Sequence, residues 1–135
     1  MDGIAFVISG PAGVGKTTLC DRLIINYPDF LSRVVTVTTR KPRVGEIEGR
    51  DYHFVTKDKF KDLIQNQEFI EFAKIHNNFY GSTLKSVQEL FNNGRDVLLN
   101  IDVQGASSLR NIQGKYEFLK KKIQSVFIAP AHLND

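Results

Sequence analysis

A glycine-rich segment near the N-terminus constrains this chain more than any other feature. It runs through Gly10, Pro11, Ala12, Gly13, Val14, Gly15, Lys16 and Thr17. The apolar residues 4–8 before it are typical of a strand buried on both faces, and Leu19, Leu23 and Ile24 after it repeat at helical spacing. The order of strand, glycine turn and helix indicates an α/β unit built on a parallel sheet.

The same segment matches the phosphate-binding loop pattern G-x-x-x-x-G-K-[ST] in full. Glycines let the backbone N–H groups face phosphate oxygens, the helix N-terminus adds positive potential, and Lys16 supplies a charge for the β- and γ-phosphates. Thr17 would hold Mg²⁺ through its hydroxyl. The alternative is a glycine turn that binds nothing, and it leaves the lysine and the threonine at their positions unexplained.

The rest of the chain predicts further strands and helices within one domain. We expect strands over 34–38, 52–55, 68–75, 96–102 and 123–129, and helices over 57–66, 82–93 and 104–111. Because short strands crowd the middle of the chain, we expect a mixed α+β subdomain inserted into the α/β core. The expected boundaries are 1–32 and 95–135 for the core and 33–94 for the insertion.

Composition narrows the possible partners. The 135 residues carry 18 Lys+Arg and 15 Asp+Glu, a formal net charge of +3 that suits phosphate-bearing small molecules better than a nucleic-acid surface. Cys20 is the only cysteine, which excludes an intramolecular disulfide and a cysteine-cluster metal site. No apolar run is long enough to span a bilayer and the first residues lack a signal peptide's basic start, so we expect a cytoplasmic protein without membrane contact.

A basic loop is the candidate for a second phosphate site. Residues 33–43 include Arg33, Arg40, Lys41 and Arg43 and no acid, and a proline stiffens the loop. Two guanidinium groups three residues apart can hold one phosphate from two directions. The alternative is a solvated basic loop without a ligand.

An acidic residue in an apolar strand suggests what accompanies that phosphate. In the strand expected over 68–75, alternation places Phe69, Glu71, Ala73 and Ile75 on one face, where the carboxylate interrupts an apolar surface. A buried carboxylate needs hydrogen-bond donors, and guanine offers two adjacent ones, N1–H and the 2-amino group. A site built for those donors rejects a base that lacks them by about 10⁴ to 10⁵. Pairing with a structural Lys or Arg is the alternative.

Asp102 is the last candidate from the residues alone. The strand expected over 96–102 places Leu98, Asn100 and Asp102 on one side, with Asp102 at the carboxyl end where ligands of open α/β sheets bind. Asp102 could accept a hydrogen bond from a nucleotide or orient magnesium-bound water. The alternative role is an N-cap for the helix that follows.

With these features in place, the chain resembles the guanylate kinase family over nearly its whole length. The resemblance rests on five ordered segments: residues 10–17, VTTRKPRVGE at 37–46 with GRDYHFV at 49–55, EFIEF at 68–72, YGST at 80–83 and IDVQG at 101–105. It implies a P-loop nucleoside monophosphate kinase core with an inserted GMP-binding subdomain. It also implies ATP and GMP as substrates, with dGMP as a further acceptor, Mg²⁺ as cofactor, and GDP and ADP as products.

The resemblance also implies roles for single residues. It assigns the ATP phosphates to residues 10–17, with Lys16, Arg40 and Arg43 in catalysis. It assigns the GMP phosphate to Arg40, Arg43, Tyr52 and Tyr80, with Gly81 beside them, and guanine to Thr36, Glu71 and Ser82. Asp102 would lie near both nucleotides and contact Mg²⁺ through water, while Thr17 would bind the ion directly. Asn100 stands where the family usually has aspartate, so we expect a lower magnesium affinity.

The family also differs from this chain toward the C-terminus. Its members continue into an arginine-bearing lid and further elements, whereas this sequence ends at Asp135. Because such arginines are worth about 10³ to 10⁵ in rate, a chain without them is expected to bind GMP yet transfer phosphate poorly, and to leave apolar sheet surface uncovered. The alternative function is a truncated or non-catalytic guanylate-kinase-like domain that binds GMP or a protein partner without turnover. The intact segment 10–17 argues against a non-catalytic binding module, whereas a truncated domain without turnover remains an open alternative.

Overall fold

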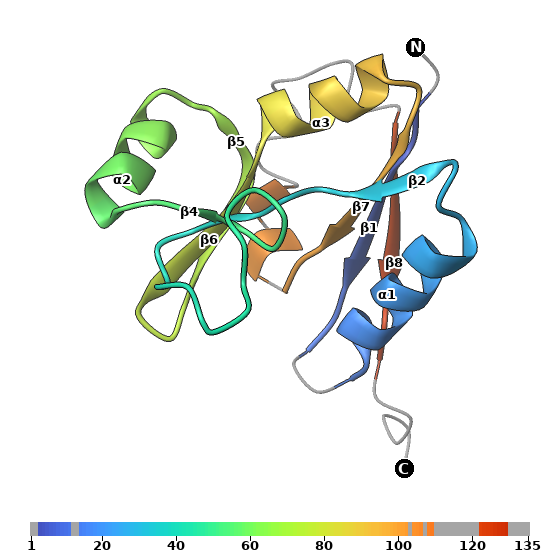
Figure 1. Ribbon diagram of the computed structural model, residues 1–135, viewed down its shortest axis with the longest axis horizontal. Coiled ribbons are helices and arrows are strands. Elements are labelled where there is room, and N and C mark those ends of the chain that lie inside the picture. The colour runs from blue at the N-terminus through green and yellow to red at the C-terminus, as the bar shows by residue number, and fades with distance from the viewer. Residues whose placement is uncertain (1–2, 12–13, 103, 107, 110–121, 130–135) are drawn as a thin grey trace.

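A parallel sheet forms the first layer of the fold (Figure 1). The computed structural model describes residues 3–11, 14–102, 104–106, 108–109 and 122–129. The strands of this sheet are β1 (Ala5–Ser9), β2 (Leu31–Arg33), β7 (Asp96–Asn100) and β8 (Ile123–Phe127), and their order is β2-β7-β1-β8. All neighbours run parallel, with Ala5 beside Val97 on one side and Ile123 on the other. The predicted α/β class is confirmed.

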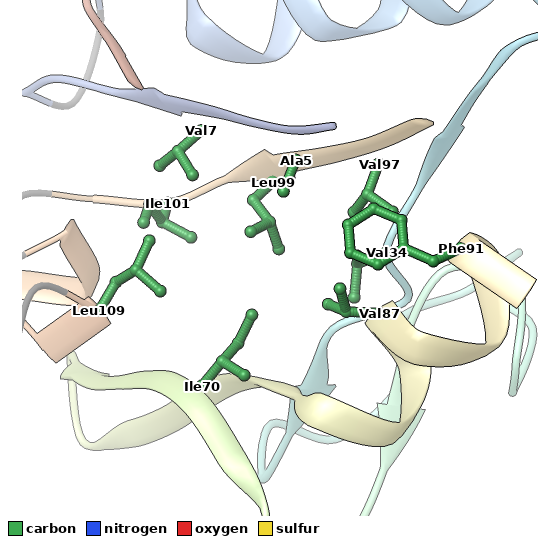
Figure 2. Packing of buried hydrophobic residues seen from close by; sticks show 10 residues of the cluster. All are labelled: Ala5, Val7, Val34, Ile70, Val87, Phe91, Val97, Leu99, Ile101 and Leu109. Carbon is green, nitrogen blue, oxygen red and sulfur yellow. The ribbon is translucent and has the colours of Figure 1, made fainter. Parts of the chain in front are cut away.

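Helices cover both faces of the parallel sheet, as parallel strands require. On one face α1 (Lys16–Asn26) packs Cys20 against Ile8 and Leu98. On the other face α3 (Leu84–Asn92) packs Val87 and Phe91 into the main cluster. Figure 2 shows this cluster, whose labelled members are Ala5, Val7, Val34, Ile70, Val87, Phe91, Val97, Leu99, Ile101 and Leu109. Ile70 comes from the second sheet, so the two sheets share one core.

The second sheet is mixed and lies beside the first (Figure 1). Its order is β4-β3-β6-β5, formed by β3 (Val37–Thr38), β4 (His53–Phe54), β5 (Phe69–Ile75) and β6 (Asn78–Thr83). β3 and β4 run parallel, and the other pairs are antiparallel. Helix α2 (Lys57–Gln65) packs on this sheet through Phe60, which is fully buried and stacks on Phe69 at 4.5 Å between ring centroids.

The expectation of one strand over 34–38 is wrong. Strand β2 ends at Arg33 in the parallel sheet, and β3 begins at Val37 in the second sheet. Between them Val34 is 2% exposed in the shared core, and its N–H donates to the carbonyl of Leu98 (3.1 Å). The run of β-branched residues therefore reflects a segment that crosses between two sheets, and alternation alone does not separate that from a continuous strand.

The expected helix over 82–93 begins too early. Ser82 and the residue after it belong to β6, which was not predicted, and α3 begins at Leu84. The hydroxyl of Thr83 accepts from the N–H of Ser86 (3.2 Å) and caps the helix. His76 and Asn77 form the turn of the β5–β6 hairpin and have positive φ angles of 49° and 69°. Residues other than glycine adopt such angles infrequently, although asparagine and histidine do so more often than most. No glycine marked that turn in the sequence.

Further comparisons concern the ends of two elements and the subdomain boundaries. Strand β7 ends at Asn100, two residues before the expected end. Of the helix expected over 104–111, residues 104–106, 108 and 109 are helical, and the remainder lies outside the described residues. Arg33 pairs with Leu98 in the parallel sheet, and α3 packs on that sheet. The boundaries at 33 and 94 stay a prediction, although this packing favours placing α3 with the core.

Apolar surface stays exposed along the outer strand of the parallel sheet. Val126 and Phe127 of β8 are 45% and 62% exposed, and a groove of about 480 Å³ runs between α1 and the sheet, lined by Phe6, Leu23 and Phe30 among others. Separately, none of the helices in the described part of the chain has the length and apolar character needed to cross a membrane.

Candidate functional site

A cavity of about 220 Å³ lies where the parallel sheet meets the second sheet. Its lining residues are Lys16, Thr36, Tyr52, Glu71, Ala73, Ile75, Tyr80, Asn100, Ile101 and Asp102. Six of the residues expected in a site therefore gather here from α1, the segment between β2 and β3, the β3–β4 connection, β5, β6 and the end of β7. The carboxyl end of β7 opens onto this cavity, as the rule for open α/β sheets predicts.

Lys16, at the end of the glycine-rich segment, lines one side of the cavity. Gly15 is the N-cap of α1 with φ of 94°, a left-handed conformation that favours glycine although a Cβ there would meet nothing within 4 Å. The first turn of α1 has no acidic residue, so the positive end of the helix is not neutralised locally. Lys16 Nζ donates to the carbonyl of Ile101 (3.3 Å), which holds the ammonium at the cavity. Ala12 and Gly13 lie outside the described residues.

Asn100 meets the helix start from β7. Its Nδ2 donates to Thr17 Oγ1 at 3.5 Å. The amide thus faces, as a neutral donor, the hydroxyl that was expected to bind Mg²⁺.

Arg40 is fixed beside the cavity by an ion pair. Its two terminal nitrogens donate to the two carboxylate oxygens of Glu46 at 3.0 and 2.9 Å, and its guanidinium lies 5.0 Å from the ring centroid of Tyr52. The hydrogen bond from Arg40, followed by the backbone N–H of Arg43, lowers the pKa of Glu46 to about 2. The same pair raises the pKa of Arg40 above its ordinary value. The Tyr52 ring contacts the Tyr80 ring edge-on, 6.2 Å between centroids.

The other predicted basic residues behave differently from Arg40. Arg43 donates its backbone N–H to Glu46 (2.7 Å), while its side chain is exposed. Arg33 belongs to β2 and pairs with Asp21 of α1, away from the loop. The notion of one basic cluster over 33–43 is therefore wrong for Arg33, because the chain changes sheets between 33 and 40.

Carboxylates shape the β3–β4 connection, and sequence analysis gave them no role. Glu48 accepts from the N–H of Phe54 (2.7 Å) and pairs with His53 (3.0 Å), and Asp51 accepts from the N–H of Ile47 (2.7 Å). These backbone hydrogen bonds are the main reason that the pKa values of both carboxyls lie below their ordinary values. The sequence does contain a signal for these roles: acidic residues alternate with Gly45 and Gly49, a pattern that is typical of a tightly turned loop.

Glu71 is a buried carboxyl on the opposite wall. It is 4% exposed, and burial raises its pKa to about 7, further raised by Asp102 and partly offset by hydrogen bonding to Ser82, its partner in the β5–β6 register. Within the described residues no Lys or Arg forms a salt bridge with Glu71, so the structural pairing considered above is not found there. The carboxyl therefore faces the cavity without an ion-pair partner among the described residues.

A β-bulge in β5 places Phe69 on a different face from the one expected. The register shifts between Phe69 and Glu71. Glu71, Ala73 and Ile75 line the cavity together as predicted, whereas Phe69 packs on the α2 side with Phe72, 5.8 Å between ring centroids. The extra residue turns Phe69 away from the expected face.

Three further expected residues sit close to this wall. Ser82 is 1% exposed beside Glu71, and Gly81 is buried where a Cβ would lie 2.7 Å from the Phe69 ring. Thr36 lies between β2 and β3, and its carbonyl accepts from the N–H of His53 (2.9 Å). Thr36 lines the cavity and Ser82 adjoins it through Glu71, whereas a Cβ on Gly81 would face Phe69 on the α2 side of the sheet.

Asp102 serves as a helix cap and lines the cavity. Its Oδ1 accepts from the N–H of Gly105 (2.8 Å), and its carbonyl accepts from the N–H of Ala106 (3.0 Å). The N-cap alternative is thus confirmed, and the residue still borders the same space as Lys16 and Glu71.

A parallel sheet with a glycine-rich segment of the P-loop pattern after its first strand, meeting a second sheet at a cavity, defines an α/β protein of the P-loop class. The family model for guanylate kinase matches residues 3–135. Over 119 residues the chain is 50% identical to the guanylate kinase of Nitratidesulfovibrio vulgaris, covering 87% of this chain and 57% of that protein. Over 133 residues it is 38% identical to that of Clostridioides difficile, covering 98% and 61%.

A solved structure agrees with these relatives. The crystal structure of guanylate kinase from Anaplasma phagocytophilum superimposes with a TM-score of 0.69 at 35% identity, covering 93% of this chain and 58% of that one. The chain belongs to the guanylate kinase family. It spans between one half and two thirds of the length of these relatives.

Proposed function

We propose that this chain holds the two substrate sites of a guanylate kinase, which transfers the γ-phosphoryl group of ATP to GMP and yields ADP and GDP. One observation carries the proposal: the buried carboxyl of Glu71 and the ammonium of Lys16 line the same cavity from the two halves of the fold. A residue that can select a base and a residue that can bind donor phosphates would thus bring both substrates together.

Glu71 is the proposed reader of the acceptor base. Its ionised carboxylate would accept from guanine N1–H and the 2-amino group, which would offset the cost of keeping a charge in a buried position. Adenine offers no such pair of donors, so AMP would leave the carboxylate unsatisfied. Ser82 and Thr36 would complete the contacts to guanine.

The acceptor phosphate is assigned to Arg40, Arg43, Tyr52 and Tyr80, with Gly81 beside them. Arg40 is already held by Glu46, so it would lose little conformational entropy when it binds an anion. Arg43 is exposed and would approach from the solvent side. The two tyrosines would direct the phosphate toward the phosphate-binding segment.

The donor site is assigned to residues 10–17. Backbone N–H groups and Lys16 would neutralise the ATP phosphates, while an oxygen of the GMP phosphate attacks the γ-phosphorus and the bond to the β–γ bridging oxygen breaks. ADP then leaves with that oxygen, and no covalent enzyme intermediate is required. The protein's contribution is position and charge.

Magnesium fits the donor side chemically. The hydroxyl of Thr17 and, through water, the carboxylate of Asp102 are oxygen ligands, which Mg²⁺ prefers, and the ion takes the rest of its shell from phosphates and water. When bound, Mg²⁺ neutralises charge on the donor phosphates. Because Asn100 presents its amide nitrogen to Thr17, we expect weaker magnesium binding than with a carboxylate there.

The test measures binding and turnover in the same preparation. The purified chain is incubated with ATP, Mg²⁺ and either GMP or AMP, products are separated by chromatography, and binding of each nucleotide is measured by calorimetry. Lys16→Ala should abolish GDP formation and weaken ATP binding while GMP binding survives. Lys61→Ala, an exposed lysine on α2, is the matched control and should leave both unchanged.

Each outcome decides between the candidate functions. GDP formed only with GMP, and absent with Lys16→Ala, supports the kinase. GMP binding without GDP supports the non-catalytic domain. If neither ATP nor GMP binds, or if AMP is turned over as fast as GMP, the result contradicts the proposal.

A further inference from the structure

The short helix after β7 contacts β5 at two points, both next to Glu71. Gly105 is buried, and a methyl group on its Cα would lie 2.8 Å from Glu71 Oε2, 3.1 Å from Ile101 Cβ and 3.4 Å from Asp102 Oδ1. One turn later, the hydroxyl of Ser108 accepts from the backbone N–H of Phe72 at 3.2 Å. Residues three apart on a helix share a face, so both contacts come from the same side of this helix.

Backbone conformation does not explain the glycine at 105. The described glycines with positive φ are Gly10, Gly15, Gly45, Gly49 and Gly94, and Gly105 is not one of them. Alanine is also the better helix former. The remaining explanation for a glycine is the lack of room for a side chain, because the atom closest to a Cβ at this position would be the carboxylate oxygen of Glu71.

The Ser108 contact acts on the backbone that carries Glu71. Phe72 directly follows Glu71, just past the bulge in β5. A bulged strand has lost part of its regular ladder, so a hydrogen bond from outside the sheet restricts its position. Together, the absent Cβ at Gly105 leaves room for the carboxylate oxygen, and the Ser108 hydrogen bond holds the backbone next to Glu71.

We propose that Gly105 and Ser108 are positioning residues that set the base specificity of the acceptor site by fixing the Glu71 carboxylate. This inference rests on the proposed function. Accepting N1–H and the 2-amino group together requires both carboxylate oxygens in place, whereas a displaced carboxylate can meet only one donor. Gly105 provides the room that the productive position of Glu71 needs.

The experiment compares GMP with inosine monophosphate, which keeps N1–H but lacks the 2-amino group. Dissociation constants for both nucleotides and for ATP are measured by calorimetry on the wild type, Gly105→Ala and the control Gln104→Ala, an exposed neighbour on the same helix. Gly105→Ala should weaken GMP binding about tenfold or more and inosine monophosphate binding less. The preference for GMP should therefore shrink, while ATP binding stays at the wild-type value.

A second pair of variants keeps the test decisive if Gly105→Ala does not fold. Ser108→Ala should reduce the GMP preference about threefold, and Ser108→Thr, which keeps the hydroxyl, should restore it. An unchanged GMP preference in Gly105→Ala, or equal values for the two Ser108 variants, overturns the inference. A wild-type chain that does not bind GMP overturns the proposed function instead.

Discussion

Replacing Glu71 with glutamine should stabilise the fold and remove guanine recognition. The carboxyl has a pKa of about 7 in the folded protein against an ordinary value of 4.5, mainly because burial disfavours its charge. Between these two pH values the folded state holds a proton that the unfolded state has released. The stability of the wild type must therefore fall as pH rises through this window.

The magnitude follows from the two pKa values. At about 1.4 kcal/mol per pH unit, the window from 4.5 to 7 corresponds to a loss of about 3 kcal/mol in the free energy of unfolding, complete by about pH 8. Glutamine carries no charge to bury, so Glu71→Gln avoids this loss. The variant should equal the wild type within about 1 kcal/mol at pH 5 and exceed it by up to about 3 kcal/mol at pH 8.

Urea unfolding followed by circular dichroism at pH 5, 6.5 and 8 measures this difference. Glu68→Gln is the matched control, because Glu68 is exposed and lies three residues away. Calorimetry on the same samples should find that Glu71→Gln binds GMP much more weakly, since its amide keeps one acceptor oxygen but replaces the other with an N–H donor that meets a donor of guanine. The reasoning would be refuted if the difference in free energy of unfolding between Glu71→Gln and the wild type were the same at pH 5 and pH 8.

Three further predictions use the same contacts. GMP affinity of the wild type should rise about tenfold between pH 6 and pH 8, because Glu71 must be ionised to accept from guanine, and calorimetry on Glu71→Gln should give no such rise. Glu46→Ala should weaken GMP binding about fivefold by releasing Arg40, with ATP binding unchanged; equal weakening by Lys41→Ala, an exposed neighbour, would contradict this. Phe60→Ala should cost about 3–5 kcal/mol in urea unfolding, since the ring is fully buried, and a cost under 1 kcal/mol would contradict its place in that core.

Local patterns predicted the elements whose signals are local. The glycine-rich segment predicted β1, the turn and α1, and the polar run after Thr56 predicted α2 almost to its last residue. The change of sheet at Val34 and the bulge before Glu71 were not predicted. Both lie at contacts with distant segments, Leu98 at the first and the helix after β7 at the second, and the periodicity of the sequence contains no information about these contacts.

The site residues also divide into those that the sequence predicted and those that depend on distant contacts. Lys16, Glu71 and Asp102 were expected from residue type and position, and the structure brings them to one cavity. Glu46 was missed because its role depends on a loop that folds back to Arg40, six residues earlier. Gly105 was missed because the reason for a glycine there is the carboxylate of a residue 34 positions earlier in the chain.

The place where the chain leaves and rejoins the parallel sheet has a consequence for recombination. Val34, at the exit, and Val87, at the return, lie in the same hydrophobic cluster (Figure 2). Everything between them therefore begins and ends at one spot on the parallel sheet, an arrangement that tolerates exchange of the enclosed segment. A relative's second sheet, joined at these two points, would meet the same core, so we expect the enclosed segment to be exchangeable between family members while the glycine-rich segment, Gly105 and Ser108 stay in place.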